Sequence, residues 1–364
     1  MVSHQVSRVD TLGALNHALP ALKTQIKDIL AHVCGRHEMP ESIASMVDEY
    51  YSRCLDYNIV GGKLARARTV CEALVFCCPG PIDRQSDKFR AAVLLAWCVE
   101  ILQAFFLIED DVMDRGETRR GQPCWYRVPA VGVANAINDG LLLEQVLYEL
   151  IELNEYTKPI AVQAHRKLRD AAMRTVIGQH LDTCPPTSVL EYTRDQWLSV
   201  VRFKTAFYTF FLPCELGILV SGVKFTDSDL SKLRNLSLLL GELFQAQDDM
   251  LDCFGDPSII GKIGRDIEER KCTWLWYTAL EVCVNKQEMR QELVSLYSSS
   301  ELATDPAVPA RIKDLYQQLE IPSVFDSYAS NLKGQIDSCI ASIEATELQN
   351  LGKWLLESTV GRKK

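Results

Sequence analysis

Two long apolar stretches that each end in a cluster of aspartates constrain this sequence most. Residues 91–114 and 227–252 carry apolar side chains at three- and four-residue spacing over many turns, which is the spacing of one face of an α-helix. Each stretch closes with the pattern Asp-Asp-x-x-Asp, at residues 110–114 and 248–252. Both stretches are too long for β-strands, so they predict long buried helices that carry negative charge at one end.

The rest of the chain shows the same helical pattern. Residues 162–178 and 271–285 repeat it, while alternating strand patterns bounded by Asn-Gly or Asp-Gly turns are missing. No low-complexity linker and no repeat of fixed period divides the 364 residues. The sequence therefore predicts an all-α fold, with residues 1–364 forming a single large helical bundle of roughly ten long helices.

Composition narrows the classes of partner and compartment. The net charge of −9 argues against nucleic-acid and anionic-membrane partners, which require a basic face. Residues 91–108 are nearly apolar enough to span a membrane, but Glu100 and Gln103 within them favour a buried core helix. The thirteen cysteines form no C-x-x-C pair, which indicates reduced, buried thiols and a cytoplasmic protein. Residues 1–26 lack the apolar run of a secretory signal, and a mitochondrial presequence stays open as an alternative.

The two acidic clusters are candidate metal sites. Positions four residues apart lie on one face of a helix, so Asp110 and Asp114 project side by side. Such a pair repels itself unless a cation neutralises it, and hard carboxylate oxygens suit Mg²⁺. If only one such cluster were present, it could equally be the solvated, charged end of a helix. The second cluster, which begins at Asp248, favours shared metal ions because each cluster closes a core-like helix.

Basic residues close to both clusters could contact the phosphate oxygens that no metal holds. Arg119 and Arg120 follow the first cluster, and guanidinium groups suit bidentate phosphate contacts. The other candidates are Lys63 and Arg66 after a glycine turn, and Lys262 and Lys271 beyond the second cluster. Each alone could be an exposed surface charge. The chain has no complete P-loop, no G-x-G-x-x-G and no H-E-x-x-H motif.

These motifs resemble the trans-isoprenyl diphosphate synthases, and within them the animal-type farnesyl diphosphate synthases. Besides the two acidic clusters, the resemblance rests on Gly-Gly-Lys at 61–63, Leu-Gln-Ala-Phe-Phe at 102–106, Thr-Arg-Arg-Gly-Gln-Pro-Cys-Trp-Tyr at 118–126, Phe-Lys-Thr-Ala-Phe-Tyr at 203–208, Phe-Gln-Ala-Gln at 244–247, Gly-Lys-Ile-Gly at 261–264 and Lys-Cys at 271–272. The motifs follow one another in the order of the family and span most of the chain.

The resemblance implies an all-helical homodimer whose bundle surrounds a central cavity, with the acidic clusters on opposite walls. It implies that several Mg²⁺ ions, with Mn²⁺ or Co²⁺ as alternatives, bind Asp110, Asp114 and Asp248. An allylic diphosphate would contact Arg119, Lys204, Lys262 and Lys271, with Thr205 and Gln245 near the reacting carbon. Isopentenyl diphosphate would contact Lys63, Arg66, Gln103 and Arg120, helped by Arg362 and Lys364.

The implied reaction is the condensation of isopentenyl diphosphate with dimethylallyl or geranyl diphosphate to give farnesyl diphosphate. Phe105 and Phe106 lie about one helical turn before Asp110 and could form a floor that limits chain length, or could simply belong to the core. The chain departs from the family pattern at Ala65, Ala67, Arg115, Met250 and Arg265.

Other activities compatible with the sequence are a terpene synthase on the same fold, a geranyl diphosphate synthase and a non-catalytic subunit. A terpene synthase takes no isopentenyl diphosphate, so the retained Lys63, Arg66, Gln103 and Arg120 favour condensation.

Overall fold

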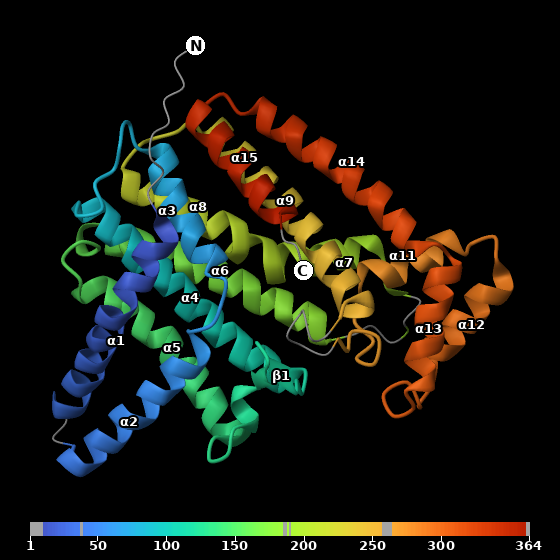
Figure 1. The fold of residues 1–364 in the computed structure, drawn as a ribbon, viewed down its shortest axis with the longest axis horizontal. Helices are drawn as coiled ribbons and strands as arrows, with labels where there is room; N and C mark the ends of the chain where they lie inside the picture. The colour runs from blue at the N-terminus through green and yellow to red at the C-terminus, as the bar shows by residue number, and fades with distance from the viewer. Residues whose placement is uncertain (1–9, 37–38, 185–187, 189–190, 257–263, 362–364) are drawn as a thin grey trace. The chain divides into compact units, whose positions relative to one another are not determined.

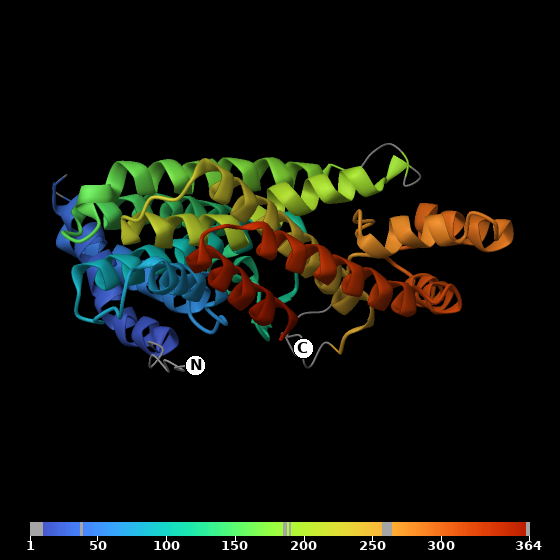
Figure 2. The same ribbon diagram turned by 90° about the horizontal axis from the view of Figure 1, so that it is seen from above.

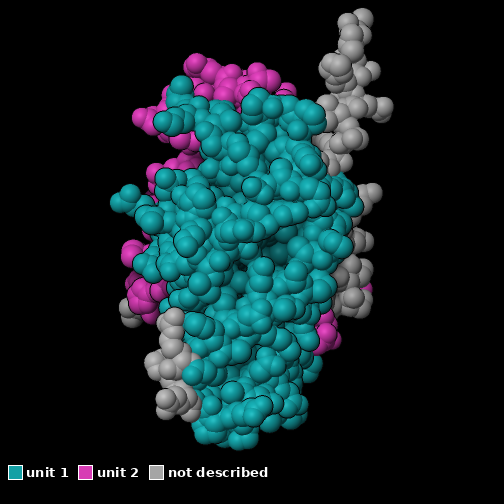
Figure 3. All heavy atoms as spheres, turned by 90° about the vertical axis from the view of Figure 1, so that its left-hand side faces the viewer, with its two compact units in different colours: residues 1–117, 123–172, 212–226 teal, residues 118–122, 173–211, 227–364 magenta. Residues whose placement is uncertain are grey.

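The computed structural model describes residues 10–36, 39–184, 188, 191–256 and 264–361. The chain divides into two compact units, which Figure 3 distinguishes by colour. The first comprises residues 1–117, 123–172 and 212–226, and the second comprises residues 118–122, 173–211 and 227–364. The predicted all-α class is confirmed, since the only strands among the described residues are β1 (Thr118–Arg119) and β2 (Gln122–Pro123). One domain around a central cavity stays a prediction.

The first unit consists of helices that pack around one central helix. Its elements are α1 (Thr11–Arg36), α2 (Glu41–Asn58), α3 (Ala65–Cys77), α4 (Asp87–Met113), the 3₁₀ helices η1 (Trp125–Arg127) and η2 (Lys158–Ile160), α5 (Gly132–Leu153), the beginning of α6 (Ala161–Thr183) and α8 (Leu212–Ser221). Helices α1, α3, α5 and α8 all contact α4 (Figure 1).

Helix α4 is central because it is apolar on all sides. Eighteen of its residues are buried, and a helix that is hydrophobic all round is stable only inside a protein. Its start is fixed by Ser86, whose hydroxyl accepts a hydrogen bond from the backbone N–H of Phe89 at 3.3 Å. Its end is fixed at Arg115, whose φ of 53° is left-handed and stops the helix. The first acidic cluster therefore lies at the C-terminal end of a rigid core element.

The second unit holds the remaining helices. They are the end of α6, α7 (Arg194–Val200), the π-helix η4 (Val201–Phe211), α9 (Asp227–Phe254), α11 (Trp274–Val282), α12 (Gln287–Ser298), α13 (Ala307–Gln318), α14 (Ile321–Ser342) and α15 (Thr346–Val360). Helices α14 and α15 pack on α9, as Figures 1 and 2 show. The predicted helix over residues 271–285 is shorter than expected. Thr273 caps it by accepting from the backbone N–H of Trp276 at 3.2 Å, which leaves Lys271 in the preceding loop.

The apolar helical stretches and the cysteines are mostly buried. Among the described residues, two helical stretches are long and apolar enough to cross a membrane, Asp87–Met113 and Arg194–Ser221. In their most apolar windows, 89% and 61% of the residues are buried inside the protein. The first stretch is thus a core helix, as predicted. All thirteen cysteines are free, and Cys184 alone is exposed.

Candidate active site

The first acidic cluster presents two carboxylates on one side of the end of α4. Asp110 lies in the last turn and Asp114 is the C-cap residue, and both are half-buried. The backbone N–H of Asp114 donates to the carbonyl of Asp110 at 2.8 Å, so the helical geometry continues through both positions. Asp111, between them, is only 5% exposed. The predicted side-by-side placement of Asp110 and Asp114 is therefore present in the backbone.

Hydrogen bonds from the next segment of the chain fix the loop that follows this cluster. Tyr126 donates from its hydroxyl to the carbonyl of Gly116 at 2.9 Å, and Arg127 donates to the same oxygen at 2.7 Å. Strands β1 and β2 then enclose Arg120 and Gly121, whose φ values of 54° and 74° are those of a type I′ turn. This turn positions Arg119 and Arg120, which belong to the second unit.

Two residues predicted to bind isopentenyl diphosphate meet in the first unit. Arg66, in the first turn of α3, donates from Nη1 to Oε1 of Gln103 on α4. The buried carboxylate of Glu100 also fastens α3 to α4, because it accepts from the backbone N–H of Ala67 at 3.1 Å. Lys63 is exposed in the loop just before α3. The structure thus places Arg66 beside Gln103, as the predicted pocket requires.

The predicted floor residues lie on α4 against α5. The rings of Phe105 and Phe106 are 5.1 Å apart between centroids, with Phe105 buried and Phe106 half-buried. A Cβ added to Gly140 of α5 would lie 3.2 Å from Cδ2 of Phe105, so the ring packs against bare backbone. Phe105 is therefore a core residue, and a role of either ring in chain length stays a prediction.

Glu109, which the sequence reasoning missed, shares this packing. A Cβ on Gly140 would lie 2.4 Å from its Oε1, and that buried oxygen accepts no hydrogen bond from the described residues. Burial raises the pKa of Glu109 to about 7. Near neutral pH this carboxyl therefore carries less than a full charge beside the first acidic cluster.

The second unit brings two predicted phosphate-binding lysines to one carboxylate. Nζ of Lys204 lies 2.6 Å from Oδ2 of Asp182, and Nζ of Lys271 lies 2.8 Å from the same oxygen. The side chains of Asp182, Lys204 and Lys271 are 10%, 25% and 11% exposed, respectively. Burial alone raises the pKa of Asp182, but the two lysine charges and their hydrogen bonds outweigh burial and lower it. We call these three residues the lysine clamp.

Nothing in the local sequence distinguishes Asp182 from a surface aspartate. Its partners lie 22 and 89 positions away along the chain, so only the folded chain reveals the lysine clamp.

Thr205 and Gln245, predicted to lie near the reacting carbon, are in direct contact. The Thr205 hydroxyl donates to Oε1 of Gln245 at 2.9 Å, and Nε2 of Gln245 donates to Oδ1 of Asp249 at 2.9 Å. Asp249 is 3% exposed and also accepts from the indole N–H of Trp197 at 3.0 Å and the backbone N–H of Trp274 at 2.7 Å. Burial raises the pKa of Asp249 to about 7, although its hydrogen bonds oppose the rise. Asp249 therefore orients Gln245 from inside the core.

The other two aspartates of the second cluster differ in environment. Asp248 is half-buried, whereas Asp252 is 8% exposed and its Oδ1 accepts from the backbone N–H of Asp266 at 3.0 Å. The loop before Lys271 is fixed by Arg270, which donates to the carbonyls of Tyr297 at 2.9 Å and Ser299 at 2.6 Å. Asp252 is therefore partly engaged by this loop, and the role of Asp248 as a metal ligand stays a prediction.

Glycines on two helices let η4 approach closely. A Cβ on Gly178 of α6 would lie 2.1 Å from the backbone nitrogen of Lys204, and one on Gly241 of α9 would lie 2.4 Å from Cβ of Ala206. The packed segment is a π-helix, a geometry that occurs often at functional sites. Lys204 and Thr205 are therefore positioned by backbone contact on both sides of η4.

Three predicted site residues, Lys262, Arg362 and Lys364, lie outside the described residues. Of the departures from the family pattern, Ala67 is fully buried, and Arg265 forms an ion pair with Glu269 at 3.6 Å. That pair partly balances the charge that Arg265 adds.

The carboxylates of Asp110 and Asp114 suit a hard divalent cation whose remaining ligands come from water and substrate. In the described part of the chain, no group of three or more His, Cys, Asp or Glu side chains is gathered as in an all-protein metal site. Asp110 and Asp114 offer two carboxylates at the end of α4, and Mg²⁺ typically binds one or two carboxylates and completes its shell with water and phosphate oxygens.

Comparison with known proteins gives a consistent picture. Residues 48–316 match the family model for polyprenyl synthetase. The farnesyl pyrophosphate synthase of Rattus norvegicus is 40% identical over 300 residues, which cover 79% of this chain and 82% of the relative. The Homo sapiens farnesyl pyrophosphate synthase is 38% identical over 315 residues, covering 85% and 72%. A solved T. brucei farnesyl diphosphate synthase complexed with risedronate is similar with a TM-score of 0.84, at 28% identity, over 96% of this chain and 100% of that one.

Proposed function

The chain belongs to the polyprenyl synthetase family, and we propose that it condenses isopentenyl diphosphate with dimethylallyl and geranyl diphosphate to give farnesyl diphosphate and diphosphate. The observation that carries this proposal is the 40% identity to a farnesyl pyrophosphate synthase over 79% of the chain. The enzyme is thus a prenyltransferase. Arg66 and Gln103, which contact each other, are assigned to the second substrate, which a terpene synthase would not bind.

We assign the allylic diphosphate to the cations of the second unit, Lys204 and Lys271, together with Arg119 and Lys262. The lysine clamp holds two ammonium groups at one carboxylate oxygen, which limits their motion before the substrate arrives. Isopentenyl diphosphate is assigned to Lys63, Arg66, Gln103 and Arg120. Fixed cations of this kind stabilise charge more strongly than mobile ones because little reorganisation is needed.

The proposed metal is Mg²⁺, held by Asp110, Asp114 and Asp248. When bound, it supplies positive charge to the diphosphate oxygens. The half-buried position of all three carboxylates supports this assignment, since each keeps a solvent-accessible side.

The reaction breaks the allylic C–O bond, and its electron pair leaves with the diphosphate. The charges of Lys204 and Lys271 stabilise that departing anion. Stabilisation of the allylic cation is assigned to the oxygens of Thr205 and Gln245, which lie 2.9 Å apart. The isopentenyl double bond then supplies the electrons of the new C–C bond. Loss of a proton, which the released diphosphate accepts, restores the double bond.

Product analysis tests this function. Purified protein is incubated with Mg²⁺ and isopentenyl diphosphate plus dimethylallyl or geranyl diphosphate, and products are identified before and after phosphatase treatment. Farnesol after phosphatase treatment is the expected result. A product that stops at geraniol would indicate a geranyl diphosphate synthase, and volatile hydrocarbon formed without isopentenyl diphosphate would indicate a terpene synthase.

A homodimer and a cytoplasmic location complete the proposal. On α5 the exposed apolar residues Val133, Ile137 and Leu141 recur every four positions, 48%, 39% and 51% exposed. Such a stripe on one helix face is typical of a surface that a partner covers. The free cysteines are compatible with a reducing compartment, and fractionation of cells that express the tagged protein would test the location.

A further inference from the structure

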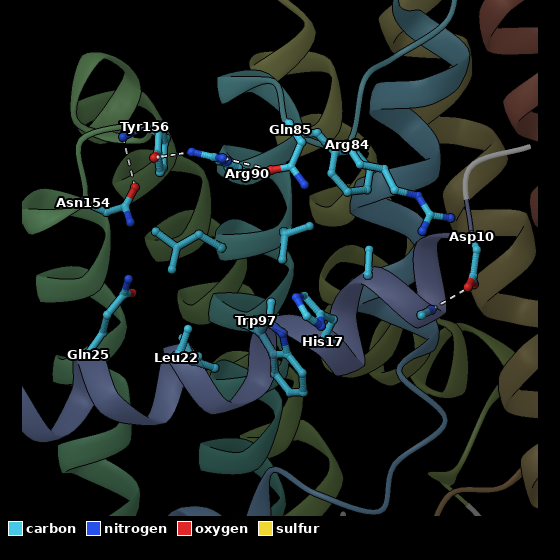
Figure 4. Close-up of a pocket in the computed structure, with 17 residues that line it drawn as sticks. Asp10, His17, Leu22, Gln25, Arg84, Gln85, Arg90, Trp97, Asn154 and Tyr156 are labelled. Atoms are coloured by element: carbon cyan, nitrogen blue, oxygen red, sulfur yellow. Dashed lines mark hydrogen bonds between the residues drawn. The ribbon is translucent and has the colours of Figure 1, made fainter.

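A cavity lies in the first unit, lined by α1, residues 84–85, the N-terminal half of α4 and the segment after α5 (Figure 4). Its volume of about 620 Å³ falls within the range of small-molecule sites, roughly 300–1,000 Å³. Trp97, the lining residue of α4 closest in sequence to Asp110, precedes it by 13 positions, or roughly 20 Å of helix. The cavity is therefore separate from the first acidic cluster.

One side of the cavity is apolar. Leu22, Phe89 and Trp97 are at most 3% exposed and form this wall together with Val93 and Leu94. The residues of α1 that face the same space are mostly alanines and a glycine, which leave room for a ligand. An apolar wall of this kind binds hydrocarbon by removing it from water.

The opposite edge is lined by polar side chains, as Figure 4 shows, and two of them are the arginines Arg84 and Arg90. Nη1 of Arg90 donates to the hydroxyl of Tyr156 at 2.7 Å, and Nη2 donates to Oε1 of Gln85 at 2.9 Å. Both acceptors are neutral, so these bonds orient the guanidinium without cancelling its charge. Arg84 is exposed at the same edge and forms no ion pair with any described residue.

A single carboxylate lines the cavity. Asp10 accepts from the backbone N–H of Gly13 at 2.9 Å and lies at the end of the cavity where Arg84 lies. Two arginines and one aspartate leave a small positive excess. That small excess can neutralise a ligand with one negative charge, but two guanidinium groups beside a carboxylate cannot neutralise a headgroup with several charges.

We propose that this cavity binds an amphipathic monocarboxylate, that is, a hydrocarbon chain ending in one carboxylate. The chain lies along Leu22, Phe89 and Trp97, and the carboxylate pairs with the guanidinium fork of Arg84, a geometry that favours two parallel hydrogen bonds. A prenyl diphosphate is disfavoured here by its charge. The proposal does not depend on the function proposed above.

Calorimetric titration of the full chain with dodecanoate, below its micelle concentration, tests the site. Wild-type protein is expected to show saturable binding at one site. Arg84→Ala should weaken binding about tenfold, the value of one charge-assisted interaction. Ala21→Trp places a large ring at an exposed lining position, so it should abolish binding without removing core packing. Arg166→Ala, which removes an exposed arginine of α6, is the matched control and should bind like wild type.

Two further ligands identify what the cavity recognises. Dodecanol has the same chain without the charge and should bind at least about tenfold more weakly. Geranyl diphosphate should not displace dodecanoate from the wild type, since its charge disfavours binding in this cavity. Unchanged dodecanoate binding in Ala21→Trp, equal binding of dodecanol, or displacement of dodecanoate by geranyl diphosphate would each overturn the proposal.

Discussion

At the scale of single residues, Asp182 holds two cations of the second unit, Lys204 and Lys271, close together. Two lysines placed side by side would repel each other, and the shared carboxylate oxygen removes that repulsion. Because the side chain of Asp182 is only 10% exposed, its charge is stable only while both lysines stay in place. Displacement of Lys204 or Lys271 would therefore destabilise this unit.

Asp182→Asn should destabilise the protein by about 2 kcal/mol. Removing one partner of a fully buried ion pair costs about 3–5 kcal/mol, and the cost is smaller here because Lys204 is a quarter exposed. Urea denaturation measures this change. Glu292→Gln is the control, since it breaks the exposed Glu292–Arg311 pair and should cost less than about 1 kcal/mol. Equal costs for the two variants would contradict the lysine clamp.

The lowered pKa of Asp182 also predicts a pH dependence. Asp182 binds its proton more weakly in the folded protein, so the stability it contributes is present above the unfolded pKa, about 3.9. This stability is lost as the pH falls through the lower folded pKa. Between neutral pH and strong acid, Asp182→Asn should therefore lose less stability than the wild type.

In steady-state assays the variant should raise KM for the allylic diphosphate and leave KM for isopentenyl diphosphate unchanged.

Asp110→Ala and Asp248→Ala should each lower turnover by orders of magnitude while leaving the melting temperature nearly unchanged. Both carboxylates are half-buried and are assigned to the metal, so their loss removes charge stabilisation of the leaving diphosphate. Asp326→Ala, which removes an exposed aspartate of α14, is the control for general loss of negative charge. Near-normal rates in either cluster variant would refute the metal assignment.

At the scale of elements, the π-helix η4 depends on the glycines that it packs against. Gly178→Ala would put a Cβ 2.1 Å from the backbone nitrogen of Lys204, so α6 and η4 must separate. We expect a loss of about 1–3 kcal/mol in unfolding free energy and a lower turnover as Lys204 shifts. Gly334→Ala in α14 meets nothing within 4 Å and should be neutral or stabilising by up to about 1 kcal/mol. Melting curves and turnover rates of the two variants test this difference.

The α4–α5 contact predicts where product length is controlled. Phe105→Ala and Phe106→Ala should both yield longer prenyl products, because each removes a ring close to the acidic end of α4. Phe105→Ala should also cost about 3–5 kcal/mol of stability, since this ring is buried against Gly140. Chromatography of the dephosphorylated products gives the chain length. If neither variant changes it, the floor is made of other residues.

At the scale of the whole molecule, the exposed apolar stripe of α5 predicts the oligomeric state. Leu141→Glu introduces a charge into the apolar stripe at its most exposed residue and should produce monomers, as measured by light scattering after gel filtration. Val284→Glu is the control, because Val284 is 61% exposed and lies outside this stripe. Wild-type protein that is already monomeric, or a dimeric Leu141→Glu, would rule out this interface.

The sequence determined the features that depend on spacing within one segment. Apolar periodicity predicted the long helices and the all-α fold, and the family motifs indicated the trans-isoprenyl diphosphate synthases. Helical spacing also placed Asp110 and Asp114 on one side of their helix. These features need only the local geometry of the backbone, which the order of residues sets directly.

Only the tertiary structure decided which polar groups are buried and what they contact. Asp248 and Asp249 are adjacent, yet Asp249 alone enters the core, where Trp197 and Trp274 donate to it. Asp182 meets lysines 22 and 89 positions away, and the cap at Thr273 leaves Lys271 in a loop to reach it. The physical reason is that periodicity identifies the faces of a helix, whereas the partner of each face is chosen by packing between segments distant in the chain.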